Sequence, residues 1–336
     1  MTMPLASNNT PVSAKRAVSP ELLKNLAILP FIVVLVTVGS LVSNVFLTVP
    51  NLTNVLYQSS ILMMVVVAQV LVLLSGEIDL SSESIVTLAP MTAAIMMAPM
   101  SNGGIGWEIS GYAGFAVALA VGALAGAING FLVVKVKLNA FITTLAMLIL
   151  LRGVALGVGR GNTVYNLPDV FLFLGSGRFL NLPMPIWISG AVVVLVSLFL
   201  RYHWIGRSIY AIGGNAEAAR TAGINVDRTK VLLFIAAGVL AALAGIMLTG
   251  RIASATSNQG ANLIFSTLAA AVIGGVSMNG GRGTLFGAFL GVLLLGLVQN
   301  ILLLAQVATY WIDAAYGAII VAALLLSRVV GGASSK

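Results

Sequence analysis

Three acidic residues stand close together in an otherwise apolar stretch, within the segment SGEIDLSSES at residues 75–84. They are Glu77, Asp79 and Glu83, and each lies at the edge of a predicted membrane span. A carboxylate is costly inside a bilayer, so a buried one typically marks a solute, ion or proton pathway. Asp79 also suits the N-cap of a helix beginning at Leu80, because Glu83 would then lie in the first turn, where the helix dipole favours negative charge. Helix cap, translocation path and proton relay all remain open for these acids.

A second group of candidate residues follows the basic residues Lys135 and Lys137. It consists of Phe141, Thr143 and Thr144, at the start of another apolar run. Polar side chains on a membrane helix face protein or water more often than acyl chains. We therefore predict that Thr144, together with Phe141 and Thr143, borders a translocation path near the inner face.

The chain lacks the residues that most enzymes need. It has no cysteine and one histidine, His203, which excludes disulfides, thiolate metal sites and a histidine metal cluster. The phosphate-binding motif G-x-x-x-x-G-K-[ST] is absent, since the glycine-rich segment between Gly275 and Gly281 has glycine in place of the lysine. This segment is expected to form a tight turn at the inner face. We expect no catalytic activity, and no metal or cofactor bound by this chain.

Residues 202–230 form the longest charged stretch of the sequence. Asn215 is suited to cap a short helix, AEAARTA, with Glu217 in its first turn and Arg220 near its last, and Gly223 then supplies a left-handed terminator. About seven residues are too few for a helix that is stable alone in water. The pattern therefore predicts a docking element for a soluble partner, and an ordinary solvated loop is the alternative.

The overall composition indicates whether water or lipid surrounds the helices that carry these residues. Hydrophobic residues make up 59% of the chain and charged residues 8%, and the mean hydropathy is +1.07. Soluble domains carry about 25% charged residues, so the chain is expected to lie in a lipid bilayer. The net charge of +8 comes from basic residues in short loops between apolar runs, which indicates membrane orientation and argues against nucleic acid as a partner.

The apolar runs predict an all-α polytopic membrane protein with about ten spans, because a crossing helix needs about 20 apolar residues. The third and eighth are weak, and either is allowed to be a broken or re-entrant element inside the protein. The predicted spans are 27–47, 54–75, 80–100, 112–134, 139–158, 184–200, 231–250, 263–277, 285–304 and 307–327.

Basic residues predict the orientation, because cytoplasmic loops are enriched in Lys and Arg. With the N-terminus inside, most of the 17 basic residues face the cytoplasm, and those left at the outer side are Arg152, Arg160, Arg178 and Arg251. Both termini are therefore expected inside. The expected parts are a cytoplasmic segment 1–26, a transmembrane domain 27–327 that includes the cytoplasmic loop 201–230, and a cytoplasmic tail 328–336.

Two glycine stripes predict close helix packing, since small residues on one face let helix backbones approach each other in lipid. Glycine recurs at every fourth position in the predicted spans 112–134 and at the start of 285–304. The stripes are Gly122, Gly126 and Gly130, and Gly283, Gly287 and Gly291. A contact within one subunit and a contact between two subunits both remain possible.

Five segments between residues 46 and 296 together carry a resemblance to a known family. In order they read FLTVPNLTNVL, SGEIDLS, NGFLVVKVKLNAFITTLAMLILLRGVAL, IYAIGGNAEAARTAGINV and LAAAVIGGVSMNGGRGTLFGAFLGVLLLG. On these segments the chain resembles the permease subunits of the ribose/xylose/galactose branch of bacterial ABC importers. The last two segments are the most specific.

The resemblance implies a ten-span permease in the bacterial inner membrane, similar in architecture to the cobalamin-importer type. It also implies a pore made by two permease subunits, as a homodimer or a heterodimer, with two cytoplasmic ATPases that bind ATP and magnesium. A periplasmic binding protein would deliver a sugar. By the same match, residues Asn215 to Gly223, followed by Ile224, would be the coupling helix that sits in a groove of the ATPase.

The chain also departs from the family pattern, which leaves the identity of the sugar open. Glu77 stands in place of a glycine, Ser82, Glu83 and Ser84 in place of Val-Gly-Ser, Ala140 in place of a proline, and Ser266 and Thr267 in place of an acidic pair. The alternative function is an autonomous secondary transporter or channel. It would need paired ionisable residues near the bilayer midplane, whereas the sequence places its acids at span ends.

Overall fold

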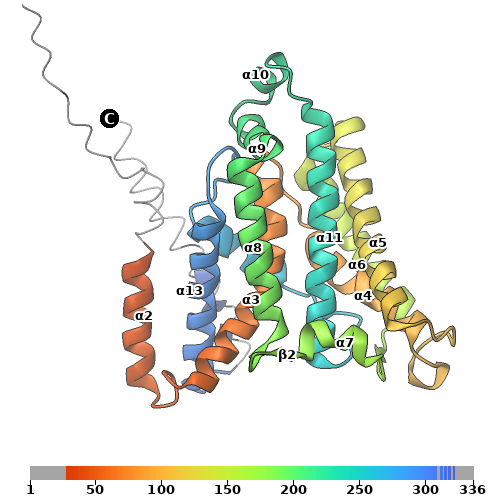
Figure 1. The fold of residues 1–336 in the computed structure, drawn as a ribbon, viewed down its shortest axis with the longest axis vertical. Coiled ribbons are helices and arrows are strands. Elements are labelled where there is room, and N and C mark those ends of the chain that lie inside the picture. The colour runs from red at the N-terminus through yellow and green to blue at the C-terminus, as the bar shows by residue number, and fades with distance from the viewer. Residues whose placement is uncertain (1–27, 309–310, 313, 316, 319–320, 322–336) are drawn as a thin grey trace, which may run out of the picture.

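The computed structural model describes residues 28–308, 311–312, 314–315, 317–318 and 321. The predicted segment 1–26, much of the predicted span 307–327 and the tail 328–336 lie outside the described residues. Within the described part the chain is overwhelmingly helical, and its strands are short pairs at the ends of the helices (Figure 1).

Six helices of the described part are long and apolar enough to cross a membrane. They pack side by side as a bundle, which makes the chain an all-α multi-pass membrane protein (Figure 1). These helices are α3 (Val49–Leu74), α5 (Gly111–Gly130) continued by the π-helical turn η2 (Phe131–Lys135), α6 (Ala140–Gly159), α8 (Met184–Tyr202), α11 (Val226–Ile252) and α13 (Leu285–Leu304).

Three predicted spans are shorter than expected. They are α2 (Leu29–Val42), α4 (Ser82–Met97) and α12 (Leu263–Ile273), where the sequence predicts spans 27–47, 80–100 and 263–277. At 1.5 Å per residue, the 11 residues of α12 cover only about 17 Å of a hydrocarbon core about 30 Å thick. Irregular backbone precedes both α4 and α12, so these two elements are short helices inside the bundle, as expected for the two weak spans.

The short elements gather at the two ends of the bundle. At one end lie α9 (Trp204–Gly214) and α10 (Ala216–Thr221), and we call this the α10 end (Figure 1). The opposite end, the α7 end, holds α7 and the four strands. Its elements are η1 (Met100–Asn102), α7 (Asp169–Ser176), β1 (Thr163–Val164) paired antiparallel with β4 (Ala255–Thr256), and β2 (Arg178–Phe179) paired antiparallel with β3 (Leu182–Pro183).

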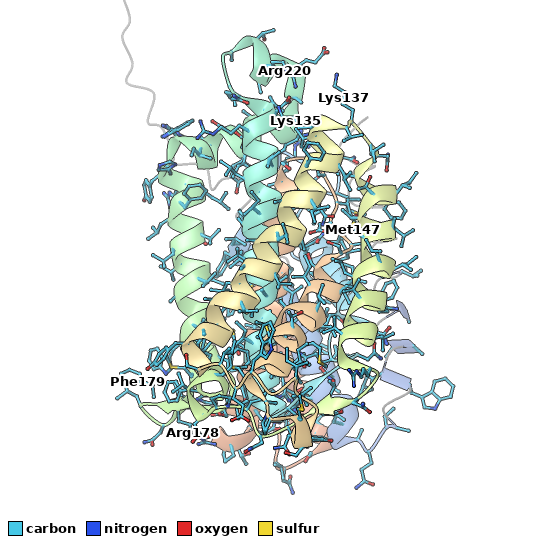
Figure 2. All side chains as sticks on the ribbon, turned by 90° about the vertical axis from the view of Figure 1, so that its right-hand side faces the viewer. Lys135, Lys137, Met147, Arg178, Phe179 and Arg220 are labelled. Atoms are coloured by element: carbon cyan, nitrogen blue, oxygen red, sulfur yellow. The ribbon has the colours of Figure 1, made fainter. Side chains whose placement is uncertain are left out.

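Charged side chains mark both ends. Figure 2 shows Lys135, Lys137 and Arg220 at the α10 end and Arg178 at the α7 end, with Met147 on the middle of α6 between them. Residues from distant parts of the sequence therefore meet at the same end, as the predicted alternation of spans requires.

The first glycine stripe lies against α11 of the same chain. A Cβ at Gly122 would lie 2.4 Å from the carbonyl oxygen of Gly238, and a Cβ at Gly238 would lie 2.1 Å from the carbonyl oxygen of Gly122. One turn further, a Cβ at Gly126 would lie 2.2 Å from the carbonyl oxygen of Phe234, and one at Gly130 would meet Val231. The backbones of α5 and α11 thus touch directly, which gives dispersion contacts that larger side chains would prevent.

The second stripe divides between a helix and a turn. Gly287 and Gly291 on α13 face α12, since a Cβ at Gly291 would lie 2.1 Å from the carbonyl oxygen of Ala270, and the Gly287 carbonyl lies against Gly274. Gly283 lies ahead of α13 with φ +131, so it belongs to the turn between α12 and α13 and is not part of the helix. The expected tight turn is present at the α10 end.

Candidate functional site

The short helix α10 is capped at both of its ends. At its start the Oδ1 of Asn215 accepts a hydrogen bond from the N–H of Ala218 at 2.9 Å. At its end Gly223 adopts φ +83, its N–H donates to the carbonyl of Arg220, and the N–H of Ile224 donates to the carbonyl of Ala219. These bonds satisfy backbone groups that a six-residue helix would otherwise leave free, which is why a segment this short holds its shape.

One side of α10 packs inward and the other faces outward. Ala219 is buried against Ile212 of α9 and Val226 of α11, with Ile224 packed against the same cluster. Glu217 and Arg220 are exposed, and α10 projects beyond the bundle in Figure 1. The helix therefore presents a small polar surface on an apolar base.

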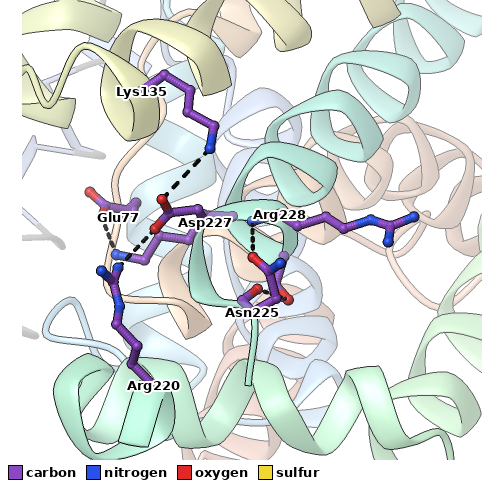
Figure 3. Close-up of polar contacts among 8 residues, drawn as sticks. Glu77, Lys135, Arg220, Asn225, Asp227 and Arg228 are labelled. Atoms are coloured by element: carbon purple, nitrogen blue, oxygen red, sulfur yellow. Dashed lines mark hydrogen bonds and ion pairs between the residues drawn. The ribbon is translucent and has the colours of Figure 1, made fainter. Parts of the chain in front are cut away.

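Ion pairs connect this end of the molecule across several elements (Figure 3). The Nη2 of Arg220 lies 2.8 Å from Oδ1 of Asp227 at the start of α11, and the Nζ of Lys135 lies 3.8 Å from the other oxygen of Asp227. The Nζ of Lys230 lies 2.5 Å from Oε1 of Glu77, just after α3. The pairs of Asp227 are well exposed and contribute little, whereas the Glu77 pair is mostly shielded from water.

Helix α9 connects α10 to the ends of α3 and α13. A Cβ at Gly213 would lie 1.9 Å from the carbonyl oxygen of Leu74 and 2.3 Å from the backbone nitrogen of Gly281, and the latter two atoms are hydrogen-bonded to each other. The hydroxyl of Tyr210 donates to the carbonyl of Gly283 at 3.0 Å. Helix α9 is absent from the elements predicted above, although Ile205, Ile209 and Ile212 have the spacing of one apolar helix face.

Asp79 lies in the irregular segment between α3 and α4, and its side chain is fully buried. Its Oδ1 accepts from the backbone N–H of Ser81 at 2.8 Å and from the Ser81 hydroxyl at 2.6 Å, and its Oδ2 accepts from the Ser82 hydroxyl at 3.1 Å. Asn129 of α5 donates to the same Ser81 hydroxyl. The prediction of a helix beginning at Leu80 is wrong, because Asp79 bonds Ser81 in a turn and α4 begins only at Ser82.

The three predicted path residues on α6 lie on different sides of that helix. Thr143 and Thr144 are buried, and the Thr144 hydroxyl donates to the carbonyls of Ala140 and Ile78, at 2.8 and 3.2 Å. Phe141 is 51% exposed. Within one chain, Thr144 therefore lies beside the Asp79 segment, and of the three only Phe141 reaches the surface.

An ion pair joins the buried acid Glu83 to the half-exposed Arg152. Glu83, in the first turn of α4, accepts a hydrogen bond from Nη2 of Arg152 on α6 with Oε1, and from the backbone N–H of Ile264 on α12 with Oε2 at 3.3 Å. From the sequence, Arg152 is expected at the outer side and no ionisable pair is expected inside the spans. The second expectation is wrong, because Glu83 on α4 reaches Arg152 on α6 across 69 residues of sequence.

In the described part of the chain, neither the region of α10 nor the region of the Glu83–Arg152 pair has the ligands of a metal centre. Among the described residues, no group of three or more His, Cys, Asp or Glu side chains is arranged to hold a metal ion. The candidate functional features are therefore a capped helix at one end, a helix that connects it to the bundle, and a polar centre where α4, α6 and α12 meet.

Comparison with known proteins gives consistent matches over nearly the whole chain. The family described as branched-chain amino acid transport system / permease component matches residues 51–324. The Escherichia coli K12 ribose import permease protein RbsC is 36% identical over 94% of this chain and 98% of its own length. The Azospirillum brasilense L-arabinose ABC transporter permease protein AraH is 32% identical over 90% and 86%, and the E. coli K12 D-allose transport system permease protein AlsC is 34% identical over 87% of both. No solved structure matches the chain.

Proposed function

This chain belongs to the branched-chain amino acid transport system / permease component family and is a pore-forming permease subunit of an ABC importer; from this premise we propose that it carries a monosaccharide across the bacterial inner membrane. Its relatives are named for ribose, L-arabinose and D-allose, which supports an aldose without selecting one. ATP hydrolysis in such an importer takes place on a separate ATPase.

The proposed complex contains two permease subunits, two cytoplasmic ATPases with ATP and magnesium, and a periplasmic binding protein. In each permease subunit ten spans, arranged as in the cobalamin-importer type, place both termini in the cytoplasm. The α10 end is then cytoplasmic, together with residues 1–26, 201–230 and 328–336. The cluster of Lys135, Lys137 and Arg220 at that end supports this orientation (Figure 2).

The observation that carries the proposed coupling to an ATPase is the structure of α10. A helix of six residues is capped on both sides, projects from the bundle and is connected through α9 to the end of α3. Asn215, Glu217, Arg220, Gly223 and Ile224 therefore form the proposed coupling element, in which Glu217 and Arg220 face the ATPase. A movement of the ATPase would reach α3 through the contact between Gly213 and Leu74.

Replacing Gly223 with alanine is expected to weaken coupling without disturbing insertion. A Cβ at this position meets no atom within 4 Å, so the cost arises only from the left-handed backbone, at roughly 1 kcal/mol or more. That strain lowers the population of the docking conformation about fivefold. Transport and the ATPase activity stimulated by loaded binding protein should both fall, in complexes reconstituted into proteoliposomes.

Charge reversal in Glu217→Arg should give the same two losses, because it changes the outward surface while α10 remains capped. Gly214→Ala is the matched control for Gly223→Ala, since Gly214 is also exposed, meets no atom within 4 Å and lacks a left-handed backbone. Normal uptake and normal stimulation in both Gly223→Ala and Glu217→Arg would show that the segment is an ordinary solvated connection.

A further inference from the structure

The Glu83–Arg152 ion pair lies near the middle of the length of α6. Arg152 is the thirteenth residue of α6, so it lies about 18 Å from Ala140 along a helix about 30 Å long. Among the described residues, the other ion pairs all involve Asp227 or Lys230 at the α10 end. This pair is therefore the one placed near the middle of the bilayer.

The two partners differ sharply in exposure. The side chain of Glu83 is 3% exposed, whereas that of Arg152 is 43% exposed. Leu145 and Leu156, which share this edge of α6 with Arg152, are exposed as well. An arginine facing acyl chains at this depth is costly, so such side chains face protein or a water-filled space. The Arg152 edge of α6 must therefore be covered by something other than lipid.

We propose that Arg152 lines the translocation path and donates hydrogen bonds to hydroxyl groups of a neutral, polyhydroxylated solute as it passes. The proposal rests on the function proposed above, in which the path runs between two permease subunits. Among contacts of the described residues, only Nη2 of Arg152 is engaged, so the guanidinium keeps N–H donors for a ligand.

Glu83 explains why the ligand would be uncharged. Its carboxylate balances the charge of Arg152 and fixes the orientation of the guanidinium, while the N–H of Ile264 holds the second oxygen. The centre is neutral as a whole and presents donors with a fixed geometry. An anionic solute would find no net positive charge there, whereas sugar hydroxyls would find directed donors.

The first arm of the test measures uptake with two variants. The double variant Glu83→Gln/Arg152→Gln removes both charges together, so no unpaired buried charge remains, and Arg152→Lys keeps the ion pair but loses the planar fork of donors. Uptake of radiolabelled D-ribose, L-arabinose and D-allose is measured in proteoliposomes holding the complete importer. Assembly is checked by co-purification with the ATPase. Both variants should assemble and transport about tenfold less, as expected for the loss of charge-assisted hydrogen bonds.

A purely structural pair gives a different result in this arm. If the pair only holds α4, α6 and α12 together, Arg152→Lys should transport normally because its ion pair survives. Near-normal uptake by either assembled variant would overturn the proposal.

The second arm leaves the ion pair intact and tests which face of α6 meets water. The chain has no cysteine, so Leu156→Cys and Leu150→Cys each carry a single reactive thiol. At 100° per residue, position 156 lies about 40° from Arg152 around the helix and position 150 about 160°. A charged thiol reagent should modify Leu156→Cys, more slowly when transported sugar is present, and should leave Leu150→Cys unmodified. No modification at position 156 in any nucleotide state, or equal modification at both positions, would overturn the proposal.

The two proposals fail in distinguishable ways. A wild-type complex that moves none of the three sugars would contradict the proposed monosaccharide transport, whereas the labelling arm requires no transport and still locates Arg152. Normal wild-type uptake combined with an unreactive Leu156→Cys would overturn only the role of Arg152.

Discussion

Alanine at Gly213 is expected to lower ATP-driven uptake strongly. Its Cβ would lie 1.9 Å from the carbonyl oxygen of Leu74 and 2.3 Å from the nitrogen of Gly281, between two backbone atoms that are hydrogen-bonded to each other at 3.0 Å. Backbone atoms cannot rotate out of the way, so α9 must move off the end of α3. We expect uptake to fall by about tenfold or more, which corresponds to a loss of only about 1.4 kcal/mol in the docked arrangement.

The adjacent residue provides the control for this effect. A Cβ at Gly214 meets nothing within 4 Å, so Gly214→Ala should transport at close to the wild-type rate. Both variants should be compared at equal amounts of assembled complex, measured by co-purification with the ATPase. Equal uptake by Gly213→Ala and Gly214→Ala would mean that α9 does not link α10 to α3 in the working transporter.

The second large effect is expected at Gly126, where α5 meets α11. An added Cβ would lie 2.2 Å from the carbonyl oxygen of Phe234 and 2.8 Å from its carbonyl carbon, so the two helices must separate. Overpacking of this kind typically costs about 1 to 3 kcal/mol, and we expect the upper part of that range because the opposing atoms are backbone. Gly126→Ala should therefore lower the melting temperature of the purified protein in detergent.

Gly190 on α8 is the matched control, since a Cβ there meets no atom within 4 Å. Alanine is the better helix former, so Gly190→Ala should leave the melting temperature unchanged or raise it slightly. A Gly126→Ala protein as stable as Gly190→Ala would contradict the direct backbone contact between α5 and α11.

Features with local signals could be predicted from the sequence. The short helix α10 is the clearest example, because an N-cap at Asn215, a charge pattern from Glu217 to Arg220 and a left-handed glycine at Gly223 all act within nine residues of chain. The long apolar runs were equally informative, since the length of a spanning helix follows from the thickness of the bilayer.

Features that depend on distant contacts could not be predicted in the same way. The start of α4 depends on the turn of Asp79 with Ser81, and α12 begins only after Asn262, whose φ is +66. The partnership of Glu83 with Arg152 exists only because α4 and α6 lie together in space. A count of basic residues by loop therefore gives Arg152 no partner, although it lies inside an apolar run. A single arginine inside an apolar run is the feature of the sequence that indicates a buried acidic partner.

The most direct test of the central claim is site-specific cross-linking from α10 to the partner ATPase. The chain has no cysteine, so Ala218→Cys carries a single thiol on the exposed side of α10 to which a photoreactive group is attached. Phe179→Cys, exposed at the α7 end, is the matched control (Figure 2). We predict that the probe at position 218 captures the ATPase in the assembled complex and the probe at 179 does not. Capture from position 179, or no capture from 218 in a complex that still hydrolyses ATP, would contradict the assignment of α10 as the coupling helix.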